Sequence, residues 1–487
     1  MRDQSASSAG RSLYRATCGC RSTLAVNFNR RFTEALSRRN TLKGIAAGMA
    51  VAALSPASLA QSQPDDRPIL LRGARIFDGT RSKLIDGHDV LIERNMISAL
   101  IPTGQTVENA RVIDCTRKVV MPGLIDAHWH SIFAAVPAST ALAPNIDVNY
   151  VYLLAAQEAE RTLMRGFTTV RDVGGPSFAL KRIVDEKRFA GPRIYPSGAM
   201  ISQTSGHGDF RNPNEVSNPA LCSLSAAEVA GVSAIADGVP EVLKKTREQL
   251  MLGASQIKIM AGGGVSSLFD PLDSLQYTLD EMRAAVNAAS DWGTYVCAHV
   301  YTSAGIQRAL SSGVKSIEHG QLADEDTVKK IVDAGAWWSI QPFLNDEDAN
   351  PKATAEQRAM QKSIAEGTVR AFELGQKHKA KMAWGTDILF NPQGTRTQGR
   401  QLTKLSQWFD TTDVLRLATS RNAELVALSG PRNPYPGKLG VIEAGALADI
   451  LVVDGDPLAQ IDLLADPESH IQLIMKDGHI YKNSLSV

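Results

Sequence analysis

VVMPGLIDAHWH, residues 119–130, is an apolar run that closes with two histidines two positions apart. Its length and its Val, Ile and Met content are typical of a buried strand. Side chains two residues apart on a strand point to the same side, so His128 and His130 would face one point together. Because imidazoles are costly to bury without partners, the run predicts a strand that ends at a site where both rings have a binding partner.

Seven further apolar runs follow this one, and longer segments with helical spacing separate them. Residues 149–166 and 279–293, for example, carry apolar side chains at helical intervals and end near a glycine. The runs are FTTVRDVGG (167–175), RIYPSG (193–198), QIKIMAGGG (256–264), TYVCAHVY (294–301), VKSIEHG (314–320), AWWSIQPF (336–343) and MAWGTD (382–387). Eight strands, each followed by a helix over roughly three hundred residues, are typical of a (β/α)8 TIM barrel. We therefore expect an α/β fold with a TIM-barrel domain at residues 121–429.

The segments on either side of the predicted barrel, 61–120 and 430–487, have the pattern of short strands and turns. PILLRGARIFDGT (68–80) and IQLIMKDGHIY (471–481) are examples. A β-rich beginning and a β-rich end can pair with each other, which covers strand edges that would otherwise be exposed. We expect the two flanks to form one small β-sandwich domain.

Residues 1–60 have the composition of an export signal. An Arg-rich lead and SRRNTLKG (37–44) precede a mildly apolar segment that ends in small residues. Arg38 and Arg39 resemble the twin-arginine export motif, although Thr41 stands where that motif usually has Phe. The apolar segment is too short for a membrane span. We expect a periplasmic or secreted protein without a stable membrane anchor; a basic leader from a misassigned start codon is the alternative.

The composition of the whole chain is that of an ordinary globular protein, with 44% hydrophobic residues, 21% charged residues and a formal net charge of +1. This balance gives no sign of a nucleic-acid partner. Cys115, Cys222 and Cys297 would remain after removal of the leader, and an odd number in a large chain implies no disulfide framework. We expect a small-molecule substrate and assembly into a homo-oligomer.

Polar residues stand at or near the carboxyl ends of the predicted strands, where TIM barrels place their catalytic groups. An isolated His-x-His pair is more often a satisfied or surface pair than a metal site. Further ligand types at the same end of the barrel reverse that judgement, because neutral imidazoles and carboxylates that meet at one point suit divalent metals. The residues that the barrel would bring together are His128, His130, Lys258, His299, His319 and Asp387.

Lys258 lies within an apolar strand, where an unpaired ammonium costs several kcal/mol. One interpretation is a salt-bridged lysine or one whose head reaches solvent. The other is a lysine with a lowered pKa, whose free amine reacts with carbon dioxide. The resulting carbamate is anionic and bidentate, so it can bridge two metals.

Three more residues would complete such a centre. His299 and His319 can bind the second metal, and Asp387 can contact one metal and still accept a proton from water. Water between two cations loses a proton at neutral pH, and the metals polarise a carbonyl. The predicted reaction is therefore attack by metal-bound hydroxide on an amide-type carbon, with Asp387 as the base.

These motifs resemble those of the metal-dependent amidohydrolase superfamily, in the subgroup with a carboxylated lysine and a binuclear centre. The resemblance covers nearly all of the chain after residue 60. It implies that His128 and His130 bind the more buried metal and that carboxylated Lys258 bridges. It also implies that His299 and His319 bind the second metal, that Asp387 is base and ligand, and that both ions are zinc. The motifs that carry it are MPGLIDAHWH, GFTTVRDVGG, GPRIYPSG, QIKIMAGGG, CAHVYT, SIEHG, GTD and the closing GKLGVIEAGALADILVVDGDP.

SGHGDF (205–210) resembles an element of the imidazolonepropionase-like branch, which includes prolidase-like dipeptidases and ochratoxin-hydrolysing amidohydrolases. By this resemblance His207 would contact substrate or hold the loops of the site; the alternative is a solvated loop histidine. Tyr301 would face the same site and donate to a substrate carboxylate or to the developing oxyanion, or else pack as a rim aromatic.

The chain departs from this branch after Asp387, where Ile388, Leu389 and Phe390 make a bulkier, more apolar loop. We therefore expect an apolar or aromatic group near the scissile bond. The favoured substrates are Xaa-Pro dipeptides, N-acyl amino acids and amides of the ochratoxin A type. A cyclic-amide hydrolase of the imidazolone or hydantoin type is the alternative within the fold. A non-catalytic exported metal-binding protein is the alternative from another class.

Overall fold

The computed structural model describes residues 67–213, 215–216, 224–266, 269–350, 352 and 354–485. These residues belong to one unit by their contacts, which runs from Asp66 to Val487. The export signal expected at residues 1–60 lies outside the described residues, so it stays a prediction.

The two flanks of the chain contribute strands to two small sheets. One has the order β4-β3-β1-β5, and the other has the order β19-β18-β17-β6-β2. The strands are β1 (Ile69–Arg72), β2 (Arg75–Ile76), β3 (His88–Glu93), β4 (Met96–Pro102), β5 (Arg111–Asp114), β6 (Val119–Pro122), β17 (Ile450–Val453), β18 (Ile471–Lys476) and β19 (His479–Asn483). The second sheet therefore joins strands from the beginning and the end of the chain, as expected.

The junction between the flanks is the antiparallel pair β6–β17, in which Val119 lies opposite Val453 and Pro122 lies opposite Ile450. Apolar residues from both sheets, among them Val90, Val120 and Val452, form one buried cluster. The pairing is present, but a separate β-sandwich domain with boundaries at residues 121 and 430 remains a prediction.

All eight apolar runs form strands, and two short strands that we did not predict, β10 and β11, join them. The strands are β7 (Leu124–Trp129), β8 (Phe167–Asp172), β9 (Arg193–Pro196), β10 (Met200–Ser202), β11 (Ser233–Ile235), β12 (Ile257–Met260), β13 (Val296–Thr302), β14 (Ser316–Leu322), β15 (Trp337–Ile340) and β16 (Lys381–Trp384). They form two parallel ladders, β7-β8-β9 and β11-β10-β12-β13-β14-β15-β16. A closed barrel ladder, which the eight runs led us to expect, is therefore not formed by the described residues.

Side chains and single backbone hydrogen bonds bridge the two breaks in the ladder. Between β16 and β7, Asn422 Nδ2 donates to the carbonyls of Ile125 (2.7 Å) and Trp384 (2.8 Å), and its Oδ1 accepts from Trp384 N at 3.1 Å. Between β9 and β12, Gln256 Nε2 donates to the carbonyls of Asp172 (2.9 Å) and Tyr195 (2.8 Å). Buried amides thus satisfy strand groups that have no ladder partner at these positions.

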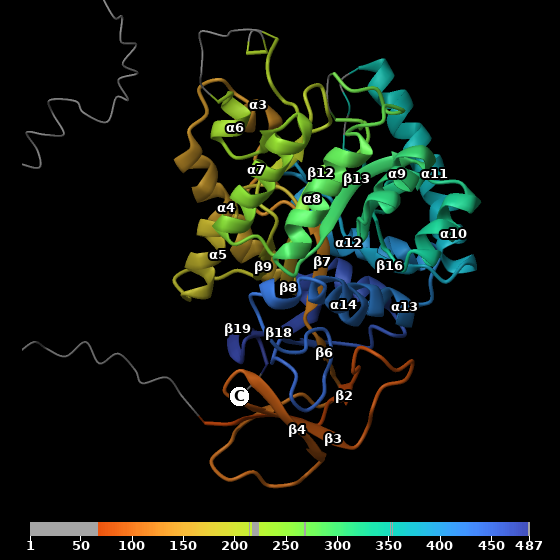
Figure 1. Ribbon diagram of the computed structural model, residues 1–487. Helices are drawn as coiled ribbons and strands as arrows, with labels where there is room; N and C mark the ends of the chain where they lie inside the picture. The colour runs from red at the N-terminus through yellow and green to blue at the C-terminus, as the bar shows by residue number, and fades with distance from the viewer. Residues whose placement is uncertain are drawn as a thin grey trace, which may run out of the picture. The chain divides into compact units, whose positions relative to one another are not determined.

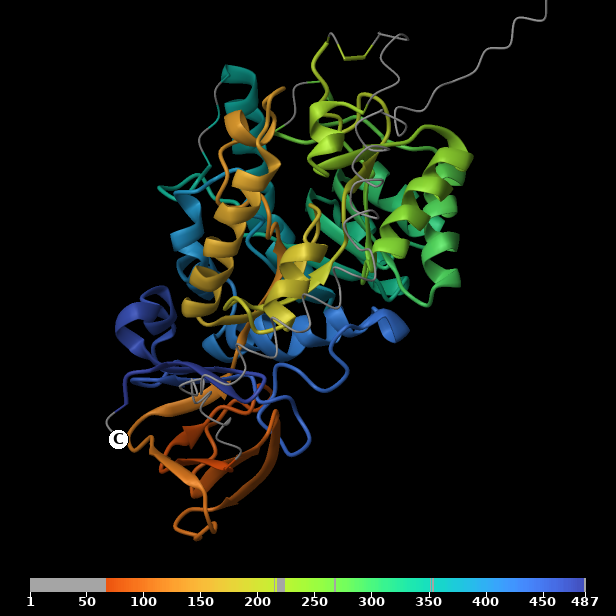
Figure 2. The same cartoon turned by 90° about the vertical axis from the view of Figure 1, so that its left-hand side faces the viewer.

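Helices alternate with the parallel strands and lie around them in both views (Figures 1 and 2). The longer ones begin at good caps: Thr278 and Glu281 form a capping box on α8, and Thr354 and Gln357 form one on α11. The helices are α3 (Ala138–Ala141), α4 (Val148–Met164), α5 (Phe178–Asp185), α6 (Ala226–Val229), α7 (Gly238–Leu252), α8 (Leu279–Asp291), α9 (Ser303–Ser312), α10 (Glu325–Asp333), α11 (Ala355–Lys377), α12 (Gln398–Thr403), α13 (Thr411–Arg416), α14 (Asn422–Ala427) and α15 (Pro467–His470). None of the described helices combines the length and the apolar character that crossing a membrane requires.

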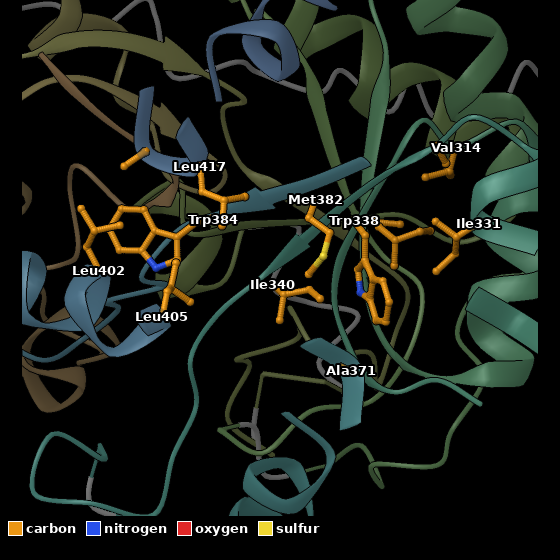
Figure 3. Close-up of a cluster of buried hydrophobic side chains, with 14 of the residues drawn as sticks. Val314, Ile331, Trp338, Ile340, Ala371, Met382, Trp384, Leu402, Leu405 and Leu417 are labelled. Carbon is orange, nitrogen blue, oxygen red and sulfur yellow. The ribbon is translucent and has the colours of Figure 1, made fainter. Parts of the chain in front are cut away.

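The main hydrophobic core lies between these helices and the strands, and two tryptophans anchor it. Figure 3 shows Trp338 beside Ile340 and Met382, while Trp384 lies against Leu402 and Leu405. Trp338 also donates its Nε1 proton to the carbonyl of His319 at 2.8 Å. The core therefore fixes a strand end at which a predicted metal ligand stands.

Replacing Asn422 by Ala should destabilise the protein, because two buried carbonyls and one buried N–H lose their partner. We expect a loss of about 2–4 kcal/mol in the free energy of unfolding. Urea unfolding followed by tryptophan fluorescence measures it. Asn149→Ala, on the exposed side of α4, is the matched control and should change stability by less than about 0.5 kcal/mol. Equal stability of both variants would show that the bridge at the β16–β7 break is dispensable.

Candidate active site

A cavity of about 390 Å³ opens at the carboxyl ends of the parallel strands. Its size suits a small organic substrate. Every site residue predicted from the sequence lines it: His128, His130, His207, Lys258, His299, Tyr301, His319 and Asp387. The topology thus brings together residues that are spread over most of the barrel sequence.

His128, His130 and Asp387 form the tightest group, with ligand atoms that lie within 4.8 Å of one another. His130 Nδ1 lies 3.0 Å from the carbonyl of Gly174, which can only accept a hydrogen bond. His128 Nδ1 lies 2.8 Å from the carboxylate of Glu318. Both rings therefore donate through Nδ1, and in the neutral form both Nε2 atoms carry a bare lone pair.

The two Nε2 atoms face the same carboxylate oxygen. Asp387 Oδ1 lies 3.2 Å from His128 Nε2 and 3.1 Å from His130 Nε2. His128 Nε2 is buried and makes no hydrogen bond with the described residues. While both rings are neutral, three acceptors converge without a donor and repel one another, and a proton on a ring or a cation between them removes the repulsion. The donor set therefore fits a divalent metal.

His299 and His319 stand beside this group, with their ring centroids 4.4 Å apart. His319 Nδ1 donates to Gln341 Oε1 at 2.7 Å, which leaves Nε2 for the site, and His299 Nε2 donates to the carbonyl of Gly263 at 3.3 Å, which leaves Nδ1. Burial holds the pKa of both rings well below the usual value for histidine, although the charge of Asp387 acts in the opposite direction. Both are neutral at pH 7, the form that binds metals.

Lys258 is 2% exposed in the middle of β12 and lines the same cavity. It makes no hydrogen bond or ion pair with the described residues. Burial lowers the pKa of its ammonium group. The salt bridge that would make this an ordinary buried lysine is not formed.

Asp387 reaches the site through a strained backbone. Its φ is +54°, and that of His319 is +74°, both in the left-handed region that non-glycine residues rarely adopt. The preceding Gly385 allows a close approach, because a Cβ there would lie 2.3 Å from the backbone nitrogen of His128. Burial alone would raise the pKa of Asp387, but its histidine neighbours outweigh it and hold the pKa well below the usual range. The carboxylate is therefore ionised at neutral pH.

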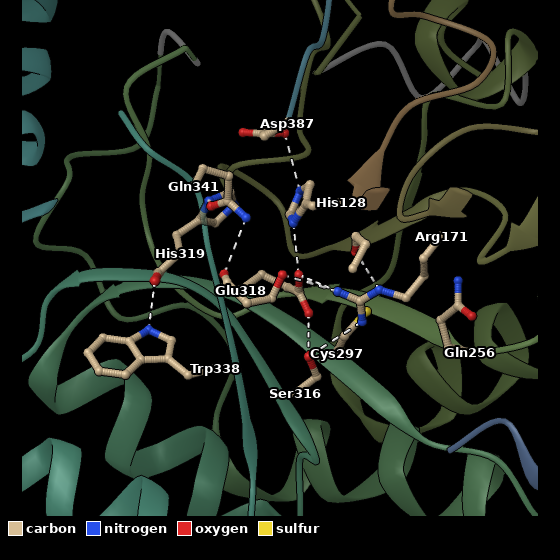
Figure 4. A network of polar contacts seen from close by, with 12 residues as sticks. His128, Arg171, Gln256, Cys297, Ser316, Glu318, His319, Trp338, Gln341 and Asp387 are labelled. Atoms are coloured by element: carbon tan, nitrogen blue, oxygen red, sulfur yellow. Dashed lines mark hydrogen bonds and ion pairs between the residues drawn. The ribbon is translucent and has the colours of Figure 1, made fainter. Parts of the chain in front are cut away.

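A buried ion pair that the sequence did not predict lies beneath His128. Glu318 Oε2, which accepts from His128, also accepts from Arg171 Nη2 at 2.6 Å, and both side chains are fully buried (Figure 4). Arg171 donates further to the carbonyl of Ala127 and lies 3.4 Å from Ser339 Oγ. Arg171 and His128 hold the pKa of Glu318 well below its usual value against the effect of burial. An ionised carboxylate thus orients His128, a predicted metal ligand.

Two aspartates support the same region from neighbouring strands. Asp126 accepts from the backbone nitrogen of His128 at 3.0 Å and from Thr386 Oγ1 at 2.7 Å. Asp172 accepts from Ser131 N and from Gly174 N, and thereby fixes the carbonyl that holds His130. The signal in the sequence was the presence of charged residues inside apolar strands, as in TVRD and SIEHG.

His207 and Tyr301 lie against the second pair of histidines. The His207 ring stacks on His299 with centroids 4.0 Å apart, and its Nδ1 lies 3.2 Å from Asp270 Oδ2. A Cβ on Gly264 would overlap this ring, at 1.9 Å from Cε1. Tyr301 stacks on His319 with a centroid distance of 5.1 Å. His207 is thus packed in the site rather than solvated.

The segment after Asp387 builds an apolar wall of the cavity. Ile388 is 4% exposed, and the Phe390 ring packs at 5.8 Å from Phe133 and at 6.1 Å from Phe210. These side chains and Leu389 line the cavity beside the metal ligands. This side therefore offers apolar surface to a bound molecule.

The model of the amidohydrolase family matches residues 119–482, most of the described chain. The chain belongs to the amidohydrolase family. As predicted, it is a hydrolase of carbon–nitrogen bonds.

Relatives of this amidohydrolase confirm the predicted prolidase-like branch. An ochratoxinase of Aspergillus niger is 29% identical over 398 residues, which cover 75% of this chain and 76% of that protein. The structure of a prolidase complexed with N-methylphosphonate-L-proline is 34% identical, with a TM-score of 0.78, over 85% of this chain and 100% of that one. A Xaa-Pro dipeptidase with methionine bound in its active site is 27% identical, with a TM-score of 0.73, over 85% of this chain and 100% of that one.

Glu318→Gln should weaken metal binding by the amidohydrolase. The amide keeps the shape of the side chain but loses the charge that orients His128 and neutralises Arg171. We expect about a 10- to 100-fold lower metal affinity, measured by competition with a coloured chelator. Glu325→Gln is the matched control, because Glu325 pairs with Lys377 and His378 at the surface and should leave affinity unchanged. Equal affinities in both variants would contradict an orienting role for Glu318.

Proposed function

We propose that this chain is a binuclear metal-dependent amidohydrolase that cleaves a peptide-like amide bond next to a terminal amino acid. The observation that carries the proposal is the convergence of bare histidine lone pairs, Asp387 and an unpaired buried lysine in one cavity. Hydrolysis by the named relatives, an ochratoxinase, a prolidase and a Xaa-Pro dipeptidase, supports an amide whose leaving group is an amino acid.

The residues present fit two metal ions, and zinc suits their nitrogen and oxygen atoms. His128, His130 and Asp387 would hold one ion, and His299 and His319 would hold the other. When bound, the ions would polarise the scissile carbonyl and lower the pKa of the attacking water.

Lys258 would bridge the two ions as a carbamate. Its neutral amine adds to the carbon of carbon dioxide through the nitrogen lone pair, and one proton leaves. The lowered pKa of Lys258 favours the neutral amine that this step needs. The product replaces an unpaired buried ammonium by an anion, which the cations would stabilise.

The side chains of the chain would carry out the proton transfers. Asp387, ionised at neutral pH, accepts a proton from the attacking water and passes it to the leaving amine. Tyr301 faces the cavity and donates to the oxygen on which charge develops or to a substrate carboxylate. His207, packed on His299, contacts the substrate from the same side. Ile388, Leu389 and Phe390 exclude water from the reacting group.

Asp387→Asn should separate catalysis from metal binding. Wild-type protein should contain about two divalent ions per chain and lose activity on chelation. The variant should retain bound metal, because four histidines remain, yet lose turnover by at least about 100-fold for want of a base. Mass spectrometry for metals and a hydrolysis assay measure the two effects. Retained turnover would exclude Asp387 as the base, while bound metal without hydrolysis of any linear or cyclic amide would favour a non-catalytic metal-binding protein.

The apolar wall predicts a preference among substrates. N-acyl or dipeptide amides that end in Phe, Leu or Pro should be cleaved with higher kcat/KM than those that end in Gly or Ser. Phe390→Ala should reduce this preference by about tenfold, because the ring buries apolar surface against the substrate. Comparison of kcat/KM across the series measures it, with Phe189→Ala, an exposed ring after α5, as control. A preference for small or cyclic amides would contradict the assignment.

A further inference from the structure

Outside the predicted metal centre, the described side chains that line the cavity leave one cation without a counter-ion. Lys404 Nζ lies 2.7 Å from Asp346 and 2.6 Å from Asp348, so its charge is neutralised. Lys258 belongs to the metal centre. Lys352 is the remaining lysine of the lining, and it forms no ion pair with any residue that the structure describes. Its Nζ donates only to the hydroxyl of Ser266, at 2.9 Å.

Lys352 is held in place beside the catalytic groups. It lies between β15 and α11, and Arg358 Nη1 of α11 donates to its carbonyl at 3.1 Å. Gln361, one turn further along α11, donates to the carbonyl of Asn350 at 2.8 Å. Burial lowers the pKa of the Lys352 ammonium, and the charge of Asp387 acts in the opposite direction. The ammonium is therefore both partly desolvated and within electrostatic reach of Asp387.

A fixed, partly desolvated cation in a substrate cavity is suited to an anionic group of the substrate. The acceptor-rich metal centre and the apolar wall at 388–390 offer no other described positive side chain for such a group, because Lys404 is already paired. Ser266 adds a second donor, since its oxygen accepts from Lys352 and its own proton stays available.

We propose that Lys352, together with the hydroxyl of Ser266, binds a carboxylate of the substrate. The inference rests on the proposed amide hydrolysis and assigns the residue that selects for an acid. The carboxylate belongs either to the terminus of the leaving amino acid or to its side chain. Both present the same chemistry to the ammonium, and the substrates of the test distinguish them.

The test compares Lys352→Met, which keeps the length of the side chain without charge, with Lys352→Arg, which keeps the charge. The substrates are a dipeptide ending in Phe, the same dipeptide amidated at its C-terminus, and an amidated dipeptide ending in Glu. Lys352→Met should raise KM for the acid that is bound by about 10- to 100-fold with little change in kcat, and should leave the amidated Phe substrate unaffected. Lys352→Arg should retain most of the affinity. Lys362→Met, exposed on α11, is the matched control.

An effect confined to the free acid identifies the terminal carboxylate, and one confined to the amidated Glu substrate identifies a side-chain carboxylate. Equal effects on all three substrates, or none, would overturn the proposal. Calorimetric binding of L-Phe and L-phenylalaninamide to metal-loaded protein needs no turnover. It tests the terminal carboxylate even if wild-type protein cleaves none of the amides, a result that would refute the proposed function alone. Binding of L-Glu against L-glutamine does the same for a side-chain carboxylate.

Discussion

The buried carboxylate of Glu318 stands between the guanidinium of Arg171 and the imidazole of His128 (Figure 4). Removal of Arg171 would leave the buried charge of Glu318 uncompensated, which typically costs about 3–5 kcal/mol. Because Arg171 keeps Glu318 ionised, His128 donates to it through Nδ1, and its other nitrogen faces Asp387 and is a bare acceptor whenever the ring is neutral. The geometry of the metal site thus follows from an ion pair one layer below it.

The breaks in the strand ladder lie next to this site. Asn422 bridges β16 to β7, whose ends carry Asp387 and His128, and the backbone nitrogen of Asp387 donates to the carbonyl of His128 at 2.8 Å. A regular ladder would fix the spacing of the two strands by backbone pairing alone. Here a side chain bridges the two strands instead, and Asp387, which follows β16, has a left-handed conformation. Irregular pairing and backbone strain occur here together, as is common at functional sites.

The sequence predicts well the strands and the side chains that meet in the cavity, because strand ends in this fold meet at one face regardless of which helices connect them. The positions of His128, Lys258 and Asp387 in the cavity needed only that rule. The partner of Arg171 could not be predicted from the sequence. An arginine within an apolar strand indicates that an acidic partner is needed, but it does not indicate which of many distant acidic residues is that partner. The breaks in the ladder and the strands β10 and β11 depend on register, to which a pattern of apolar residues is insensitive.

The cavity has two parts that differ in electrostatic character: one part suits cations, and the other suits an anion. The side that carries Asp387 and the four histidines presents acceptors when the rings are neutral, so it suits cations. The cavity wall between β15 and α11 presents Lys352, which donates to the Ser266 hydroxyl but forms no ion pair with the described residues. A substrate with a polarisable carbonyl and a carboxylate satisfies both parts once the cations are bound, whereas an uncharged amide would leave Lys352 desolvated without a counter-ion. The cost of that unpaired charge, more than any attraction, would make the site select acids.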